Sequence, residues 1–283
     1  MLPSTEFDTS FQELCDRMKK ISRRKAIGAT GLAVGAYLSG KFMPTAGASS
    51  QVANNESEHV EWKHVKLDPE KVAARAYELY SEGSCMYASF KSICSSMAEA
   101  VVDSNPSLSK ALRDFPCHMM KYGHSGLGGQ GSLCGALNGA GAAFGLFIKE
   151  KSTVDALLAE LCSFYESAKL PVFKPENSKF EPMTQAISRS VLCHVSQTAW
   201  CRRSGQSPFS DFRSDRCKRL TADVAAMAVN ILNRYADNAT VNNNLKEKEY
   251  QRCLDCHGQN GEGIKVSTKM NCAPCHTMED HYE

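Results

Sequence analysis

Apolar residues recur along the chain at the spacing of helices that pack on a core. The first predicted helix begins at Asp68-Pro69-Glu70, where an N-cap residue, a proline at the first helical position and a first-turn acid follow one another. Its apolar stripe consists of Val72, Ala73, Ala76, Leu79 and Tyr80. Gly83 predicts the end of this helix.

The same pattern predicts further helices at about 85–102, from near Cys134, at 152–169, at 184–199 and at 214–236. The last of these carries the longest apolar stripe, formed by Leu220, Val224, Met227, Ile231 and Leu232. The glycine-rich segment 123–131 is expected to be a loop and 171–182 a linker. Because no segment shows convincing strand alternation, we predict a mostly α fold.

The chain divides into five parts by composition. Residues 245–283 contain few large apolar side chains, so this tail cannot bury enough surface to offset the entropy of ordering it. The predicted organisation is a signal peptide (1–48), an irregular segment (49–67), a cysteine-rich helical domain (68–236), a linker (237–244) and a short, loop-rich C-terminal tail (245–283).

The N-terminus has the features of an export signal. Ser22-Arg23-Arg24 precedes an apolar run from Ala26 to Met43, and Ala46-Gly47-Ala48 supplies a cleavage site. These features are typical of twin-arginine signal peptides. The alternative is an uncleaved membrane anchor, but the run is short and rich in small residues. We therefore expect a periplasmic protein, exported by the twin-arginine route, with no membrane span after cleavage.

Charge and cysteine content narrow the function. The formal net charge is +2 over 283 residues, which argues against a nucleic-acid binder. Thirteen cysteines are many for a chain of this length. In an exported protein they indicate disulfides or cofactors.

The tail holds two Cys-x-x-Cys-His motifs, Cys253-Leu-Asp-Cys256-His257 and Cys272-Ala-Pro-Cys275-His276. In such a motif two thiols attach a haem covalently and the histidine becomes the proximal iron ligand. The motifs therefore predict two haem c groups, which would also serve as the core that the tail lacks. The alternative is one zinc ion held by the four cysteines, but it leaves His257 and His276 without a role.

The sixth iron ligands must come from other residues. The histidines that remain after signal cleavage are His59, His64, His118, His124, His194 and His281. Met270 and Met278 lie near the motifs, and an iron with histidine and methionine ligands has a higher potential.

Eight further cysteines follow the signal peptide: Cys85, Cys94, Cys117, Cys134, Cys162, Cys193, Cys201 and Cys217. Four disulfides are one interpretation for a periplasmic protein. An iron–sulfur cluster is the other, because Cys134 is expected at a helix N-terminus, which favours a thiolate. Residue chemistry leaves both open. The twin-arginine route carries folded proteins, which favours a cluster inserted before export and a tail that receives haem afterwards.

The glycine-rich segment Gly126-Leu-Gly128-Gly-Gln-Gly131 matches G-x-G-x-x-G. No predicted strand precedes it, so we do not expect a nucleotide site. Gly135, Gly139 and Ala143 recur every fourth residue in the helix that follows. This face would let a neighbouring helix or a cofactor approach the backbone, although a flexible loop before an ordinary core helix is an equal alternative.

Several motifs together resemble the C-GCAxxG-C-C family of redox-active proteins. They are Leu67-Asp68-Pro69, Gly83-Ser84-Cys85, Met119-Met120-Lys121-Tyr122-Gly123, Cys134-Gly135-Ala136-Leu137-Asn138-Gly139-Ala140, Leu192-Cys193-His194-Val195-Ser196 with Trp200, and Arg216-Cys217 through Leu232-Asn233. The resemblance covers about 60–236, and Cys134 to Gly139 is its most specific part. With two haem motifs appended, the whole chain resembles the dihaem, split-Soret type of cytochrome.

This resemblance implies a periplasmic homodimer with closely paired haems, bis-histidine iron and an iron–sulfur site, such as a [2Fe-2S] cluster, in the helical domain. The family cysteines correspond to Cys85, Cys134, Cys193 and Cys217, with Cys201 as a substitute or an extra. His118 and His124 stand where haemless members more often have other residues. They therefore rank first as distal ligands, ahead of His281 and His64.

These observations predict a dihaem protein that exchanges electrons with redox partner proteins. No Ser/His/Asp set, paired-carboxylate site or nucleotide loop indicates substrate chemistry. The alternatives are a haem enzyme that reduces a small inorganic molecule at an open iron site, and a structural module that carries disulfides or a metal.

Overall fold

The computed structural model describes residues 62–176, 178–238 and 251–276. The predicted signal peptide, His59, Met278 and His281 lie outside these residues. Helices dominate the described part, which is the predicted mostly α fold. Its named strands are β1 (Lys169–Leu170) and β2 (Ala186–Ile187), which form one antiparallel pair with Leu170 opposite Ala186.

Helix α3 (Pro69–Ala100) begins as the sequence predicts, since the side chain of Asp68 accepts the amides of Glu70 and Lys71. The helix is broken at Ser84, whose φ of 65° and ψ of −166° are not helical. The break falls one residue after the predicted end at Gly83. Residue 85 therefore starts a second helical segment, as predicted.

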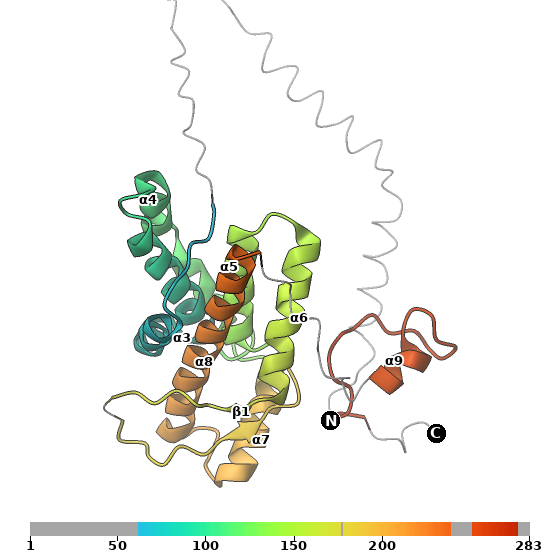
Figure 1. The fold of residues 1–283 in the computed structure, drawn as a ribbon. Coiled ribbons are helices and arrows are strands. Elements are labelled where there is room, and N and C mark those ends of the chain that lie inside the picture. The colour runs from blue at the N-terminus through green and yellow to red at the C-terminus, as the bar shows by residue number, and fades with distance from the viewer. Residues whose placement is uncertain (1–61, 177, 239–250, 277–283) are drawn as a thin grey trace, which may run out of the picture. The chain divides into compact units, whose positions relative to one another are not determined.

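Four long helices form the core (Figure 1). Helix α3 packs against α8 (Asp211–Ala236) and α5 (Gly135–Phe147), and α6 (Lys151–Ser167) packs against α5 and α8. The start of α5 and the bounds of α6 and α8 agree with the prediction to within a few residues. The fully buried side chains at their contacts include Phe90, Ile93, Phe144, Leu161, Val224 and Ile231. This core fixes the helix ends on which the cysteines lie.

Two short helices within the predicted helical domain were not expected, α4 (Pro106–Asp114) and the 3-10 helix η1 (Cys117–Gly123). Helix α4 begins because the Asn105 side chain accepts the amide of Leu108 at 3.0 Å and Pro106 occupies the first turn. The sequence predicts the helix at about 85–102, which ends before Asn105-Pro106, but not a helix that begins there.

The predicted start of a helix at 184 is wrong, because α7 covers Cys193–Ser204. Ala186 pairs with Leu170 in the small sheet, and Arg189 has a positive φ of 57°. The carbonyl of Thr184 accepts a 2.8 Å hydrogen bond from the buried Trp200 indole. These contacts hold the segment before Cys193 in a non-helical conformation.

The described part of the tail contains one short helix, α9 (Gln251–His257), and is otherwise irregular. None of its residues from 253 to 276 is buried. This agrees with a segment whose own side chains do not form a core. Among the described residues, no helix is long and apolar enough to cross a membrane.

Candidate functional site

Four cysteines from distant parts of the sequence come together at the ends of the core helices. Cys85 follows the break in α3, Cys134 is the N-cap of α5, Cys193 is the first residue of α7, and Cys217 lies in α8. Burial raises the pKa of the Cys193 thiol, and Cys134, Cys217 and Cys85 lie close enough to raise it further. We call these four residues the cysteine group.

The backbone holds Cys134 and Cys193 together. The amide of Cys134 donates to the carbonyl of Val191 at 2.9 Å, and the amide of Cys193 donates to the carbonyl of Ser132 at 2.7 Å. Leu133 and Leu192 form an antiparallel bridge between these bonds. Cys134 and Cys193 therefore both lie directly after a short paired segment, at the points where α5 and α7 begin.

The glycine-rich loop packs tightly against this segment. Gly126 has a positive φ of 70°, and a Cβ there would lie 2.6 Å from the amide nitrogen of Ser132 and 2.9 Å from the Cβ of Cys193. Only glycine satisfies both demands at once. The loop is therefore a structural support for Cys193.

The bare face predicted on α5 lies against α3. A Cβ on Gly135 would lie 2.4 Å from the Sγ of Cys85, and one on Gly139 would lie 2.3 Å from the carbonyl oxygen of Met86. The neighbour that approaches this face is thus a helix. At Gly135 it is also a thiol of the cysteine group.

Burial controls the electrostatics of the thiols. It raises the pKa of Cys85 to about 12, with the charge of Cys134 as the next cause. Burial also raises the pKa of Cys134, and this outweighs the hydrogen bond from the backbone of Ala136 at the helix N-terminus. The N-terminus of α5 thus favours the thiolate form of Cys134, but the effect of burial on the pKa is larger. Ligation of a metal would have to displace these protons.

Two buried polar side chains adjoin the cysteine group, and neither is among the site residues predicted from the sequence. Tyr165 is fully buried beside the thiol of Cys134. Arg216 is 2% exposed and its Nη1 lies 3.9 Å from the Sγ of Cys217. Arg216 directly precedes Cys217 in the sequence, and this was the signal that could have placed Arg216 beside the cysteine group.

The other cysteines lie apart from this group or at its edge. Cys201 lies further along α7, with burial and, more weakly, Cys217 raising its pKa. Cys94 is buried, and the cysteine that contributes to its raised pKa is Cys117 rather than a member of the cysteine group. Within the described ranges, no two cysteines are joined in a disulfide. Within those ranges, the thiols are gathered but no three or more are arranged as a preformed metal site.

In the tail, both haem motifs line one cavity of about 520 Å³. Its lining includes Cys253, His257, Cys272, Cys275 and His276 together with the apolar side chains of Leu254, Ile264, Val266 and Met270. The Nδ1 of His257 lies 3.0 Å from the carbonyl oxygen of Ile264, which orients the imidazole. Thiols, imidazoles and an apolar wall in one cavity fit the chemistry of haem attachment.

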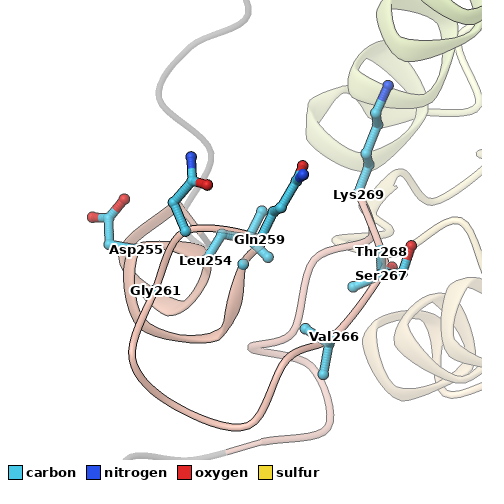
Figure 2. Close-up of a pocket in the computed structure, with 10 residues that line it drawn as sticks. Leu254, Asp255, Gln259, Gly261, Val266, Ser267, Thr268 and Lys269 are labelled. Atoms are coloured by element: carbon cyan, nitrogen blue, oxygen red, sulfur yellow. The ribbon is translucent and has the colours of Figure 1, made fainter.

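A second depression in the tail, of about 650 Å³, has a different character (Figure 2). It lies between the turn that follows α9 and the segment 266–269. Its lining mixes the apolar side chains of Leu254 and Val266 with the polar side chains of Asp255, Gln259, Ser267, Thr268 and Lys269. The apolar cavity is therefore the better match to a porphyrin.

The candidate distal ligands have contrasting environments. His118 and His124 are exposed on and next to η1. His64 is 6% exposed, and its Nε2 lies 3.0 Å from the Oδ1 of Asn233. Burial lowers the pKa of His64. The imidazole of His64 is thus hydrogen-bonded within the helical core, whereas the imidazoles of His118 and His124 are exposed to solvent.

The fold and these two sites define a helical redox protein with a c-type haem segment. The family described as "Putative redox-active protein (C_GCAxxG_C_C)" matches residues 87–231. Cys134, Cys193 and Cys217 lie inside this match, and Cys85 lies just before it. In the structure, Cys85 nevertheless lies near the other three cysteines.

Split-Soret cytochrome c from Desulfovibrio desulfuricans is 33% identical over 276 residues, which cover 91% of this chain and 95% of the relative. A solved structure that describes a novel iron centre in that cytochrome is 31% identical, with a TM-score of 0.68, and covers 78% of this chain and 92% of the other. The chain therefore belongs to the C_GCAxxG_C_C family and is a relative of split-Soret cytochrome c over nearly its whole length. The resemblance found in the sequence is confirmed.

Proposed function

We propose that this protein is an electron carrier with two covalent haems in its tail and an iron–sulfur centre in its helical domain. A redox role follows from the family and from the similarity to a cytochrome c. The number of haems, the second centre and the location go beyond that statement. Each has its own support.

The observation that carries the proposal is the single apolar cavity lined by residues of both haem motifs. Cys253 with Cys256 and Cys272 with Cys275 would hold the two porphyrins, and His257 and His276 would ligate the irons. Because both motifs reach one cavity, we propose that the two haems lie close together. Bound haem supplies one-electron chemistry and the core that the tail's side chains do not form.

The second centre is proposed at the cysteine group. Its four thiols are of the type that binds iron–sulfur clusters, and they converge from four elements although Cys217 lies 132 positions after Cys85 in the sequence. Cys201 stands nearby as a further thiol. The related cytochrome is described as containing an iron centre, which supports the same use here.

The remaining features of the proposal come from the sequence and the resemblance. The twin-arginine signal supports export to the periplasm, where the carrier would act as a homodimer and meet its redox partner proteins. We propose His118 and His124 as the first candidates for the distal iron ligands, because both imidazoles are exposed.

The test is to quantify haem, total iron and acid-labile sulfide in the full-length mature protein. We expect two haems, with iron in excess of haem and sulfide present. The variant Cys253→Ser/Cys256→Ser and the variant Cys272→Ser/Cys275→Ser are each expected to retain one haem. Two haems with no additional iron would exclude the second centre, and a protein without covalent haem would exclude the carrier.

A further inference from the structure

The geometry points to Arg216 as the residue that sets the reduction potential of the metal centre at the cysteine group, by placing a fixed positive charge beside the thiols. This inference rests on the proposed function in that it requires a redox-active iron centre there. Arg216 is a positioning and tuning residue, since its guanidinium contacts the side chain of a ligand rather than the metal.

The guanidinium of Arg216 is buried with little to balance it. The side chain is 2% exposed, yet Nη2 donates only to the Ser196 side chain at 2.9 Å and more weakly to the Ser196 carbonyl at 3.5 Å. Its Nε has no hydrogen-bond partner in the described part of the chain. Nor does any carboxylate of that part lie within 4.0 Å of it. A buried charge is costly unless a group of opposite charge is near.

Two of the groups near Arg216, Cys217 and Cys134, belong to the proposed metal site. The Nη1 of Arg216 contacts the Cys217 sulfur, and Tyr165 and Cys134 also lie near enough to influence it. The charge of Arg216 acts to lower the pKa of Asp223, although burial raises that pKa by more. The carboxylate of Asp223 accepts hydrogen bonds from the amides of Val172 and Phe173 at 2.8 and 2.9 Å, so its hydrogen bonds are made with the backbone and not with Arg216. A metal–thiolate centre is the negative group that this cation lacks.

Arg219 is a second buried arginine on α8, and its role is structural. It lies one turn along α8 and is 1% exposed. Its Nε and Nη1 bind the carboxylates of Asp215 and Glu181 at 2.7 and 2.6 Å. The charge of Arg219 is therefore balanced by acids, whereas that of Arg216 is directed at sulfur.

A fixed cation beside a metal centre favours the reduced form, because reduction adds negative charge to the centre. Removal of the charge is expected to lower the equilibrium constant for reduction at least tenfold. For a one-electron couple this is a fall of about 59 mV in the midpoint potential. The haem potentials are expected to stay unchanged.

The test is a redox titration of full-length, haem-loaded wild type, Arg216→Gln and Arg216→Lys. Electron paramagnetic resonance would follow the iron centre and visible absorption the haems. The double variant Arg219→Gln/Glu181→Gln is the matched control, since it removes a buried arginine of α8 together with one of its balancing charges. We expect a lower iron-centre potential in Arg216→Gln, a near-normal potential in Arg216→Lys, and no shift in the control.

An unchanged potential in Arg216→Gln, or an equal shift in the control, would overturn the inference. If Arg216→Gln fails to retain iron, retention by Arg216→Lys supports the role of the charge, and equal loss from both variants refutes it. Failure of the proposed function looks different, because the wild type itself would then contain no iron beyond its haems.

Discussion

The backbone of Gly135 is in direct contact with the thiol of Cys85, so that a Cβ on Gly135 would lie 2.4 Å from Sγ. The same Cβ would lie 2.5 Å from the carbonyl oxygen of Gly123. Neither the start of α5 nor the start of the second segment of α3 can therefore move alone. The position of one thiol of the cysteine group depends on a residue that has no side chain.

The variant Gly135→Ala is expected to lose the iron centre while it keeps both haems. The added methyl group displaces Cys85, and overpacking of this kind costs about 1–3 kcal/mol of stability. Iron, sulfide and haem contents measured on one preparation would check this. Gly145→Ala is the control in the same helix, because nothing lies within 4 Å of a Cβ there. Equal iron contents in the two variants would contradict the expectation.

The variants His118→Ala and His124→Ala are expected to convert a low-spin haem into a high-spin haem that binds carbon monoxide. Loss of a distal imidazole leaves an open coordination position on the iron. Absorption spectra of the reduced protein with and without carbon monoxide would show the change. His194→Ala serves as control, since its exposed imidazole is held by the carbonyl of Gly131 at 2.9 Å.

Unchanged spectra in both variants would place the distal ligands elsewhere. A wild-type protein that itself binds carbon monoxide or nitrite would favour a haem enzyme over an electron carrier.

The variant Asn233→Ala is expected to lower the free energy of unfolding by about 2 kcal/mol or more. The Asn233 side chain binds the amide and the carbonyl of Leu67 at 3.0 and 2.7 Å, and it also binds His64. Its removal leaves buried polar groups without partners. Urea unfolding followed by circular dichroism would measure the loss.

Asn230→Ala tests whether that loss is specific, since Asn230 is exposed on the same helix. Similar losses in the two variants would show that the bonds to Leu67 and His64 contribute little.

The stability of the helical domain is expected to fall as the pH rises from about 4 to about 6. Burial raises the pKa of Asp223 to about 6, although the amides of Val172 and Phe173 favour its charged form. The folded state therefore keeps this proton to a higher pH than the unfolded state, and the free energy of unfolding decreases across that interval by about 3 kcal/mol.

Unfolding curves at several pH values for wild type and Asp223→Asn would isolate this effect, because the amide does not titrate. Asp211→Asn, at an exposed site in the first turn of α8, is expected to keep the wild-type pH dependence. A flat difference between wild type and Asp223→Asn from pH 4 to 6 would refute the assignment.

Local signals in the sequence were enough to find most of the fold. Asp68 with Pro69 marks a helix start, and the stripe from Leu220 to Leu232 marks a buried helix face. The same kind of signal at Asn105-Pro106 was missed because a cap residue and a proline can both end one helix and begin the next. The error at 184 arose because Trp200 and Leu170 hold that segment by contacts distant in sequence.

The site was less predictable because it depends on tertiary contacts. Cys134 was placed correctly at a helix start, but its burial, which decides the pKa, appears only once α3 and α8 pack around it. Nothing near His64 in the sequence indicates its bond to Asn233. The buried charge of Arg216 likewise has meaning only beside the thiols.

The break in α3 has a consequence for how the cysteine group behaves as a unit. Ser84, with φ of 65° and ψ of −166°, has a backbone conformation that is adopted almost only by glycine, and it directly precedes Cys85. Neighbouring packing must hold it there, so any local opening lets Ser84 relax and carries the thiol of Cys85 away from the other three. Release of a bound metal and opening of this corner of the fold would then be one cooperative event rather than the stepwise loss of single ligands.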